Sequence, residues 1–580
     1  MKRTLTPVFL LLLSFTFFAT DLQAQTVPSQ QGAGGVSARE DLLEKEATLR
    51  DVVTTPKEAP SVEVPVDQEA QIPEGEKVLV SRIEVTGATL LSAREIRKII
   101  AEYEGKELSM RGMQEVANKI TDAYRQRGYI TSRAILPPQR IENNVLKIEV
   151  LQGTMGSVDV QGNRYYRTSL IKKRIQLKKG DVFDYNKLKT NLGVLNQYPD
   201  RKVKTVLTPG QEQGTTDLVL NVEDKLPIHV GLSYDNYASK YLGRSRYQGT
   251  LTHNNLLGFD DIFTLTYQLG EGHNTYRLSS ARYLYPLSSE TQIGFSISKS
   301  QLELGREFAN IEARGKSKIY SVYLTHDLIS DGVLDLTLNA GFDYKDVFNF
   351  QLGDETSRDR LRVARLGLKW DRADAQGRTI INNEIHQGIP NKGGALGDRD
   401  DNGLAAPNPS RSGAGGEFTK NVVDVLRLQR VGAERTLLLK GQGQLSSRAL
   451  TATEQYQLGG IFNLRGYPSG EAVGDHGFST TAELSSPVPF LAGSIKAPGS
   501  KVATLREALR WVVFYDWGQV SLRRPTSAEY KHRTLTDWGV GLRYDLPENF
   551  SVRVDVAWPI DETPSDENHM HGWVKVSKDF

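Results

Sequence analysis

Two residues of opposite charge offer the clearest chemistry in this chain. Arg465 lies in the stretch LRGYPSG, where turn-forming residues surround it, and Asp516 lies further along in the run LRWVVFYDWG. An arginine and a carboxylate form a charge-assisted hydrogen-bonded pair, which can be bidentate. Where such a pair is buried, removing one partner lowers the stability of the protein by about 3–5 kcal/mol. This chemistry fastens two segments together and changes no covalent bond.

The same two residues also fit a simpler interpretation. Arg465 would then only complete a turn, and Asp516 would be one of many carboxylates on a polar surface. Their spacing in the sequence does not separate the two interpretations.

Residues typical of enzymes and of metal centres are scarce. The nine histidines are scattered without metal-ligand spacing, and the chain has no GxSxG motif and no glycine-rich phosphate cradle between a strand and a helix. The run DRDDNG, which begins at Asp398, matches the first half of a calcium loop, but Pro409 stands where that loop needs a glutamate. We therefore expect no enzymatic activity, no cofactor and no metal centre. The segment 391–416 is expected to be an exposed loop, and its binding of calcium stays open.

Composition and the first residues narrow the class of protein. The 580 residues have a formal net charge of +2, no dense basic patch and no cysteine, which excludes disulfides and argues against nucleic acid as a partner. Lys2 and Arg3 precede an apolar run from Val8 to Ala19, and Ala24 offers a cleavage point. This pattern predicts a signal peptide over residues 1–24, with a buried N-terminal helix as the alternative. No second apolar run approaches the length of a membrane-spanning helix, about 20 residues.

The part of the chain before residue 226 is predicted to contain a linker and two small domains. Residues 25–77 are rich in proline and glycine and include one short polar helix at about 37–52, which begins with a capping box. Residues 78–153 give the order β-α-α-β-β, and residues 154–225 repeat it. We expect two α+β domains related as an internal repeat.

Residues 226–580 change to a period of two. In VLDLTLNAGFDY, for example, Leu336, Leu338 and Phe342 share one face of a strand, while Asp335 and Asp343 share the other. About sixteen such runs follow one another without long helices. This pattern predicts a transmembrane barrel of sixteen antiparallel strands with a wet lumen, and a soluble β-sandwich or propeller is the alternative.

These elements give the charged pair its position. Arg465 falls in a connection over 447–478, and loops of this length usually carry function. Asp516 shares the inward-facing parity of its strand with Phe514 and Gly518. Because an arginine near the middle of the lipid costs about 2–4 kcal/mol, the loop must either stay in solvent or fold into the lumen. In the lumen, Arg465 would need a carboxylate such as Asp516.

The chain resembles the two-partner secretion transporters of Gram-negative bacteria, the TpsB type that includes ShlB, FhaC and HecB, within the BamA-like superfamily. The resemblance covers nearly all of the chain after the predicted signal peptide. It is carried by the motifs SRIEVTGATLLSAREIR, ITDAYRQRGYITSRAILPPQ, LNQYPDRKVKTVLTPG, GLSYDNYASKYLGRSRYQGTLTHNNLLGFDD, LRGY and FYD, and by the terminal Phe580. The one departure noted is Leu464, where valine is common.

The resemblance implies roles for individual residues. Arg465 would lie in the sixth extracellular loop, fold into the barrel and pair with Asp516. Gly466 would allow the tight turn, and Tyr467 would pack beside it. Phe514 belongs to the FYD motif of the partner strand. No substrate-binding residue is assigned.

The resemblance also implies location and partners. Residues 78–153 and 154–225 would be periplasmic POTRA domains, the helix at about 37–52 would plug the pore, and the barrel would lie in the outer membrane. The partners would be an unfolded exoprotein of the haemolysin or adhesin kind with an N-terminal β-helical secretion domain, outer-membrane lipid and, during biogenesis, the barrel assembly machinery. A BamA-like assembly factor and a passive porin are the alternative functions.

Overall fold

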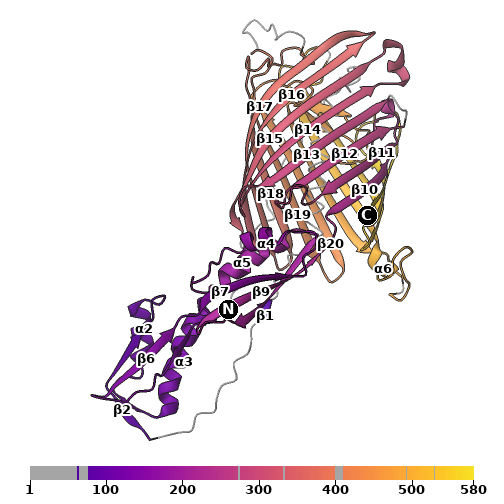
Figure 1. Cartoon of the computed structure of the whole chain (residues 1–580). Coiled ribbons are helices and arrows are strands. Elements are labelled where there is room, and N and C mark those ends of the chain that lie inside the picture. The colour runs from indigo at the N-terminus through magenta and orange to yellow at the C-terminus, as the bar shows by residue number, and fades with distance from the viewer. Residues whose placement is uncertain are drawn as a thin grey trace, which may run out of the picture.

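The structure, a computed structural model, describes residues 62–63, 76–271, 275–330, 333–398, 409–491, 493–527 and 529–580. The predicted signal peptide and the predicted plug helix lie outside these residues. Figure 1 shows two small domains in series, followed by a tall barrel. Among the helices that the structure describes, none has the length and apolar character to cross a membrane.

The first small domain packs two helices against a three-stranded sheet. Its elements are β2 (Val78–Val80), β3 (Arg82–Thr86), α2 (Ala93–Ile100), β4 (Lys106–Leu108), α3 (Met110–Gln126), β5 (Arg133–Ile135) and β6 (Val145–Leu151). Strand β6 lies in the middle, parallel to β3 and antiparallel to β5. The predicted order holds, but the first strand is divided at Ser81, and its first part pairs with the added short strand β4.

The second small domain repeats this topology. Its elements are β7 (Thr154–Gln161), α4 (Thr168–Arg174), α5 (Tyr185–Asn196), β8 (Arg201–Pro209) and β9 (Thr215–Asp224). Strand β9 lies in the middle, parallel to β7 and antiparallel to β8. A short segment from the linker, β1 (Val62–Glu63), pairs in parallel with the outer edge of β8. The sheet of this domain therefore already takes up an added strand.

Helical periodicity builds the cores of both domains. In α3, Val116, Ile120 and Tyr124 follow one another at a spacing of four and are fully buried. They share one core with Leu146 and Ile148, which lie at alternate positions of β6. The two periods, four along the helix and two along the strand, bring these apolar faces together.

The remaining residues form a closed barrel of sixteen strands, each antiparallel to its neighbours. The strands are β10 (Ile228–Asp235), β11 (Arg246–His253), β12 (Ile262–Gly270), β13 (Tyr276–Pro286), β14 (Thr291–Glu303), β15 (Arg314–Ser330), β16 (Leu334–Gln351), β17 (Asp354–Asp374), β18 (Gly377–Gly388), β19 (Thr419–Val431), β20 (Arg435–Ser446), β23 (His476–Pro487), β24 (Leu509–Ser521), β25 (His532–Leu546), β26 (Phe550–Pro559) and β27 (His571–Asp579). The last strand pairs with the first and closes the barrel. The predicted fold is confirmed, and the sandwich or propeller alternative is wrong.

The two faces of each strand differ as the period of two predicts. On β16, Phe342 and Tyr344 point out of the barrel and are each 37% exposed, whereas Asp343 and Lys345 point inward and are each 4% exposed. Apolar side chains thus coat the outer wall, and polar side chains meet in the lumen. This distribution is what a barrel surrounded by lipid requires.

A buried ion network joins the second small domain to the barrel. Asp260, in the turn between β11 and β12, is 1% exposed and accepts hydrogen bonds from Arg201 of β8 at 2.7 Å and from Arg174 of α4 at 3.1 Å. The Arg201 guanidinium also lies over the ring of Tyr198, 5.1 Å from its centroid. Burial raises the pKa of Tyr198 to about 12, so the phenol stays neutral beside these charges. The network therefore ties α4 and β8 of the second domain to one turn of the barrel.

We predict that Asp260→Ala loosens this junction, because it leaves the buried Arg201 without its carboxylate, a change that costs about 3–5 kcal/mol. The chain contains no cysteine, so two introduced cysteines, one on the second domain and one on the barrel, carry the only spin labels. Pulsed electron paramagnetic resonance should show a broader distance distribution in the variant. Glu212→Ala, which removes a fully solvated ion pair with Lys179, is the control and should leave the distribution unchanged. An equally narrow distribution in Asp260→Ala would show that other contacts set the junction.

Candidate functional site

The long connection between β20 and β23 folds back into the barrel. We call residues 447–475 the inserted loop, and most of its side chains are buried. Two short strands, β21 (Tyr456–Leu458) and β22 (Ala472–Gly474), pair with each other and brace its stem. The predicted end of the connection at residue 478 is wrong by three residues, because residues 477 and 478 already pair with β20 and therefore belong to β23.

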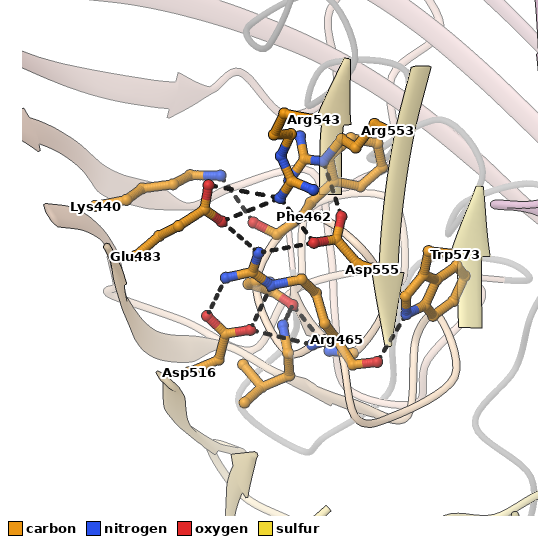
Figure 2. A network of polar contacts seen from close by, with 12 residues as sticks. Lys440, Phe462, Arg465, Glu483, Asp516, Arg543, Arg553, Asp555 and Trp573 are labelled. Carbon is orange, nitrogen blue, oxygen red and sulfur yellow. Dashed lines mark hydrogen bonds and ion pairs between the residues drawn. The ribbon is translucent and has the colours of Figure 1, made fainter. Parts of the chain in front are cut away.

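Arg465, in the turn of the inserted loop, is surrounded by carboxylates of the barrel wall. Its Nε donates to Asp516 Oδ2 at 2.8 Å, and its Nη2 donates to Asp516 Oδ1 at 3.0 Å. Its Nη1 donates to Glu483 Oε2 at 2.6 Å and lies 3.7 Å from Asp555 Oδ1. Figure 2 shows the guanidinium between these three acids, which come from β24, β23 and β26. Arg465 and Asp516 thus form a bidentate ion pair.

Phe514 completes the surroundings of the guanidinium. Its ring centroid lies 3.3 Å from Arg465 Cζ, and the ring itself is 2% exposed. Arginine stacks on aromatic faces through its delocalised plane, and this contact is strongest where water is excluded. Phe514 and Asp516 are two residues apart on β24 and therefore both point inward. One strand supplies a stacking partner and an anion for the same side chain.

The residues next to Arg465 fix its turn against a further strand, β25. The Tyr467 amide donates to the Leu464 carbonyl at 3.2 Å, which closes a tight turn with Arg465 and Gly466 at its centre. A Cβ at Gly466 would lie 2.5 Å from Asp537 Cβ, so only glycine fits so close to β25. The Tyr467 hydroxyl donates to the Thr536 carbonyl of β25 at 3.2 Å.

Two residues of the barrel wall, Gly518 and Trp573, accommodate and hold the turn. Gly518, inward-facing on β24, leaves room for the inserted loop, because a Cβ there would lie 2.9 Å from Leu464 Cδ2. The Trp573 indole of β27 donates to the carbonyl of Arg465 at 2.7 Å, so both the backbone and the side chain of this residue are held.

The charges around Arg465 balance one another. Arg543 donates to Asp555 at 2.7 Å and to Glu483 at 3.3 Å, and Arg553 donates to Asp555 at 2.9 Å. Glu483 and Asp555 therefore each have an arginine of the wall beside them as well as Arg465. Buried charges are tolerated only when they are paired and hydrogen-bonded in this way.

All five residues singled out in the sequence lie at this one place: Arg465, Gly466, Tyr467, Phe514 and Asp516. Sequence reasoning missed Glu483, Asp555 and Trp573. Glu483 and Asp555 lie at inward-facing positions of strands that alternate clearly, so parity would have marked them as lumenal. It would not have shown which of the many lumenal acids meets the loop.

The calcium-like segment DRDDNG lies, apart from its first residue, outside the described residues. Residues 399–408 lie outside the described part of the chain, and Asp398, just before them, pairs with Arg448 at 2.7 Å. Among the described residues, no group of three or more histidines and carboxylates is placed to hold a metal ion.

Comparison with known proteins places this geometry in a family. Residues 214–544 match the haemolysin secretion/activation protein ShlB/FhaC/HecB, residues 78–153 match the ShlB-type POTRA domain, and residues 154–225 match the POTRA domain described as a surface antigen variable number repeat. The heme/hemopexin transporter protein HuxB of Haemophilus influenzae strain 86-028NP is 22% identical over 505 residues, which cover 84% of each chain. The outer membrane transporter CdiB of Escherichia coli O6:K15:H31 strain 536 is 25% identical over 458 residues, 77% of this chain and 75% of CdiB.

A solved structure has the same fold. CdiB from Escherichia coli superposes with a TM-score of 0.70 at 21% identity, covering 94% of this chain and 98% of that one. Two POTRA domains before a closed barrel with an inserted loop define the class of outer-membrane transporters whose POTRA domains lie in the periplasm. Within that class, the family match spans more than half of the chain, so the chain belongs to the haemolysin secretion/activation family ShlB/FhaC/HecB. It is a two-partner secretion transporter, and the match favours secretion over the BamA-like assembly alternative.

We predict that Arg465→Ala and Asp516→Ala each impair secretion and that the double variant is no worse than the stronger single one. Either change breaks the same contact, so the second has little left to remove. Secretion of a co-expressed cognate exoprotein into the medium is the measurement.

Arg314→Ala is the matched control for this cycle. It removes a half-exposed arginine that pairs with Glu303 and Glu312 at the loop end of β15, and such exposed pairs contribute about 0–1 kcal/mol. The control should secrete normally. Fully additive losses for Arg465→Ala and Asp516→Ala would show that the two residues act separately.

Proposed function

We propose that the two POTRA domains capture an unfolded exoprotein in the periplasm and that the barrel passes it outward when the inserted loop releases its wall contacts. The observation that carries this proposal is the charged contact of Arg465 inside the lumen, because a passive pore needs no such fastening. The arginine, its turn and its stacking partner act together as a loop–barrel lock.

The wall charges make release of this lock feasible. When Arg465 leaves, Arg543 and Arg553 still neutralise Glu483 and Asp555, and Arg465 gains water. Asp516 then faces a lumen that has become wetter. Of the three wall acids beside Arg465, Asp516 alone then depends on the entering water, so release has an energetic cost that separates two states, as a switchable element requires.

Capture by strand addition is the mode that the POTRA sheets favour. An extended segment can join a sheet edge through main-chain hydrogen bonds and needs no fixed sequence to do so. The pairing of Val62 with Thr205 and of Glu63 with Val206 demonstrates, within this chain, that the outer edge of β8 accepts a parallel strand. An unfolded exoprotein would offer many such segments.

The exoprotein is inferred to be of the haemolysin or adhesin kind, with an N-terminal β-helical secretion domain. The periplasm supplies no nucleotide, so folding of the emerging chain outside the cell would bias its movement outward. Outer-membrane lipid surrounds the barrel, and the barrel assembly machinery would insert it during biogenesis.

Deleting residues 78–153 should abolish secretion of a co-expressed cognate exoprotein, because one of the two capture domains is lost. The barrel should still shift in mobility on heating before gel electrophoresis, which reports a folded barrel. Lys119→Ala removes an exposed ion pair with Glu102 and the contact of the same ammonium with the Tyr103 ring, both in this domain, and should secrete normally. Normal secretion by the deletion variant would remove the first domain from the capture step.

A further inference from the structure

A second buried charge of the inserted loop lies eleven positions before Arg465. Glu454 is 1% exposed, and both of its carboxylate oxygens are engaged by lysines of the barrel wall. Lys345 of β16 donates to its Oε1 at 3.0 Å, and Lys420 of β19 lies 2.8 Å from its Oε2. A carboxylate buried to this degree is stable only with such partners.

The backbone beside Glu454 is held as firmly. Its carbonyl accepts hydrogen bonds from Lys420 at 3.1 Å and from Gln444 at 3.0 Å. The neighbouring Thr453 hydroxyl donates to Asp359 of β17 at 3.1 Å, and this carboxylate also accepts from Ser410 at 2.6 Å. Strands β16, β17, β19 and β20 thus converge on two consecutive residues of the loop.

These strands belong to a different part of the wall from the one that holds Arg465. In the order β16-β17-β18-β19-β20-β23-β24, the lysine of β16 lies six strands away from Asp516 of β24. Six of sixteen strands bring the path close to the opposite side of a closed barrel. Lys420 of β19 lies three strands from β24, so the contacts of Glu454 begin on the far side of the lumen at Lys345 and continue along the wall toward the acids that hold Arg465.

We propose that Glu454 is a second positioning residue of the loop, an anchor opposite in charge to Arg465 that fastens the loop to Lys345 on the far side of the lumen and to Lys420 on the wall between. The inserted loop is held at both sides of the lumen, so loss of one anchor leaves it tethered across the pore. Full opening therefore needs the contacts of Glu454 to break as well as those of Arg465. This inference deepens the proposed function, on which its link to secretion rests.

The test uses the full chain in planar lipid bilayers. Glu454→Gln keeps the shape of the side chain and removes its charge. We expect large-conductance openings to become at least about tenfold more frequent, the change that a loss of about 1.4 kcal/mol produces. Combining Glu454→Gln with Arg465→Ala should open the pore more often than either single variant, because two separate anchors are lost.

A lysine variant tests whether Glu454 acts through its ion pair or only through packing. Lys420→Met preserves length and apolar volume, so it should raise the opening frequency as Glu454→Gln does, and the two changes should not add when combined. Glu303→Gln, which alters a half-exposed glutamate paired with Arg314, is the matched control and should behave as the unaltered chain.

Each outcome decides between the inferences. Unchanged conductance in Glu454→Gln, or fully additive effects of Glu454→Gln and Lys420→Met, overturns the second anchor, and the Arg465 lock and the secretion function would stand. Raised conductance with normal exoprotein secretion keeps the second anchor and removes the role of the loop in secretion.

Discussion

A buried arginine cannot remain without anions, and this constraint shapes the barrel around residue 465. Arg465 is 2% exposed, so protein groups must take the place of the water that would otherwise solvate its guanidinium. Asp516 and Glu483 accept its hydrogen bonds, Asp555 lies close by, and the ring of Phe514 covers its face. Because the partners come from several strands, the loop is held only while the barrel is closed in this register.

The charged contact also explains how a stable barrel serves transport. Sixteen strands satisfy their backbone groups among themselves, so the wall does not need the inserted loop to stay closed. Within the lumen the loop is fastened through contacts with side chains of the wall, and the wall acids Glu483 and Asp555 also pair with arginines of the wall itself. On the proposed account, the same chain builds a permanent wall and a loop that can leave the lumen, while the second POTRA domain is joined to the barrel through the buried Asp260.

Periodicity predicts much of this fold, and the reason is physical. A period of two survives along every barrel strand because one face meets lipid and the other meets the lumen, so Phe514 and Asp516 could be placed inward from sequence alone. The sites of the loop contacts could not be placed in that way. Glu483, Asp555 and Lys345 look like ordinary lumenal residues, and only closure of the barrel decides which of them a returning loop meets. Likewise, the need for glycine at position 466 comes from the approach of β25 and not from the turn alone.

Electron cryo-microscopy of the full chain in lipid nanodiscs, with and without Arg465→Ala, measures the central claim most directly. In the unaltered protein, density for residues 447–475 should fill the lumen, with the guanidinium in hydrogen-bond reach of Asp516. In the alanine variant that density should be lost from the acid-lined wall. A loop that keeps the same place against β24 in the variant would contradict the claim that this ionic contact holds it there.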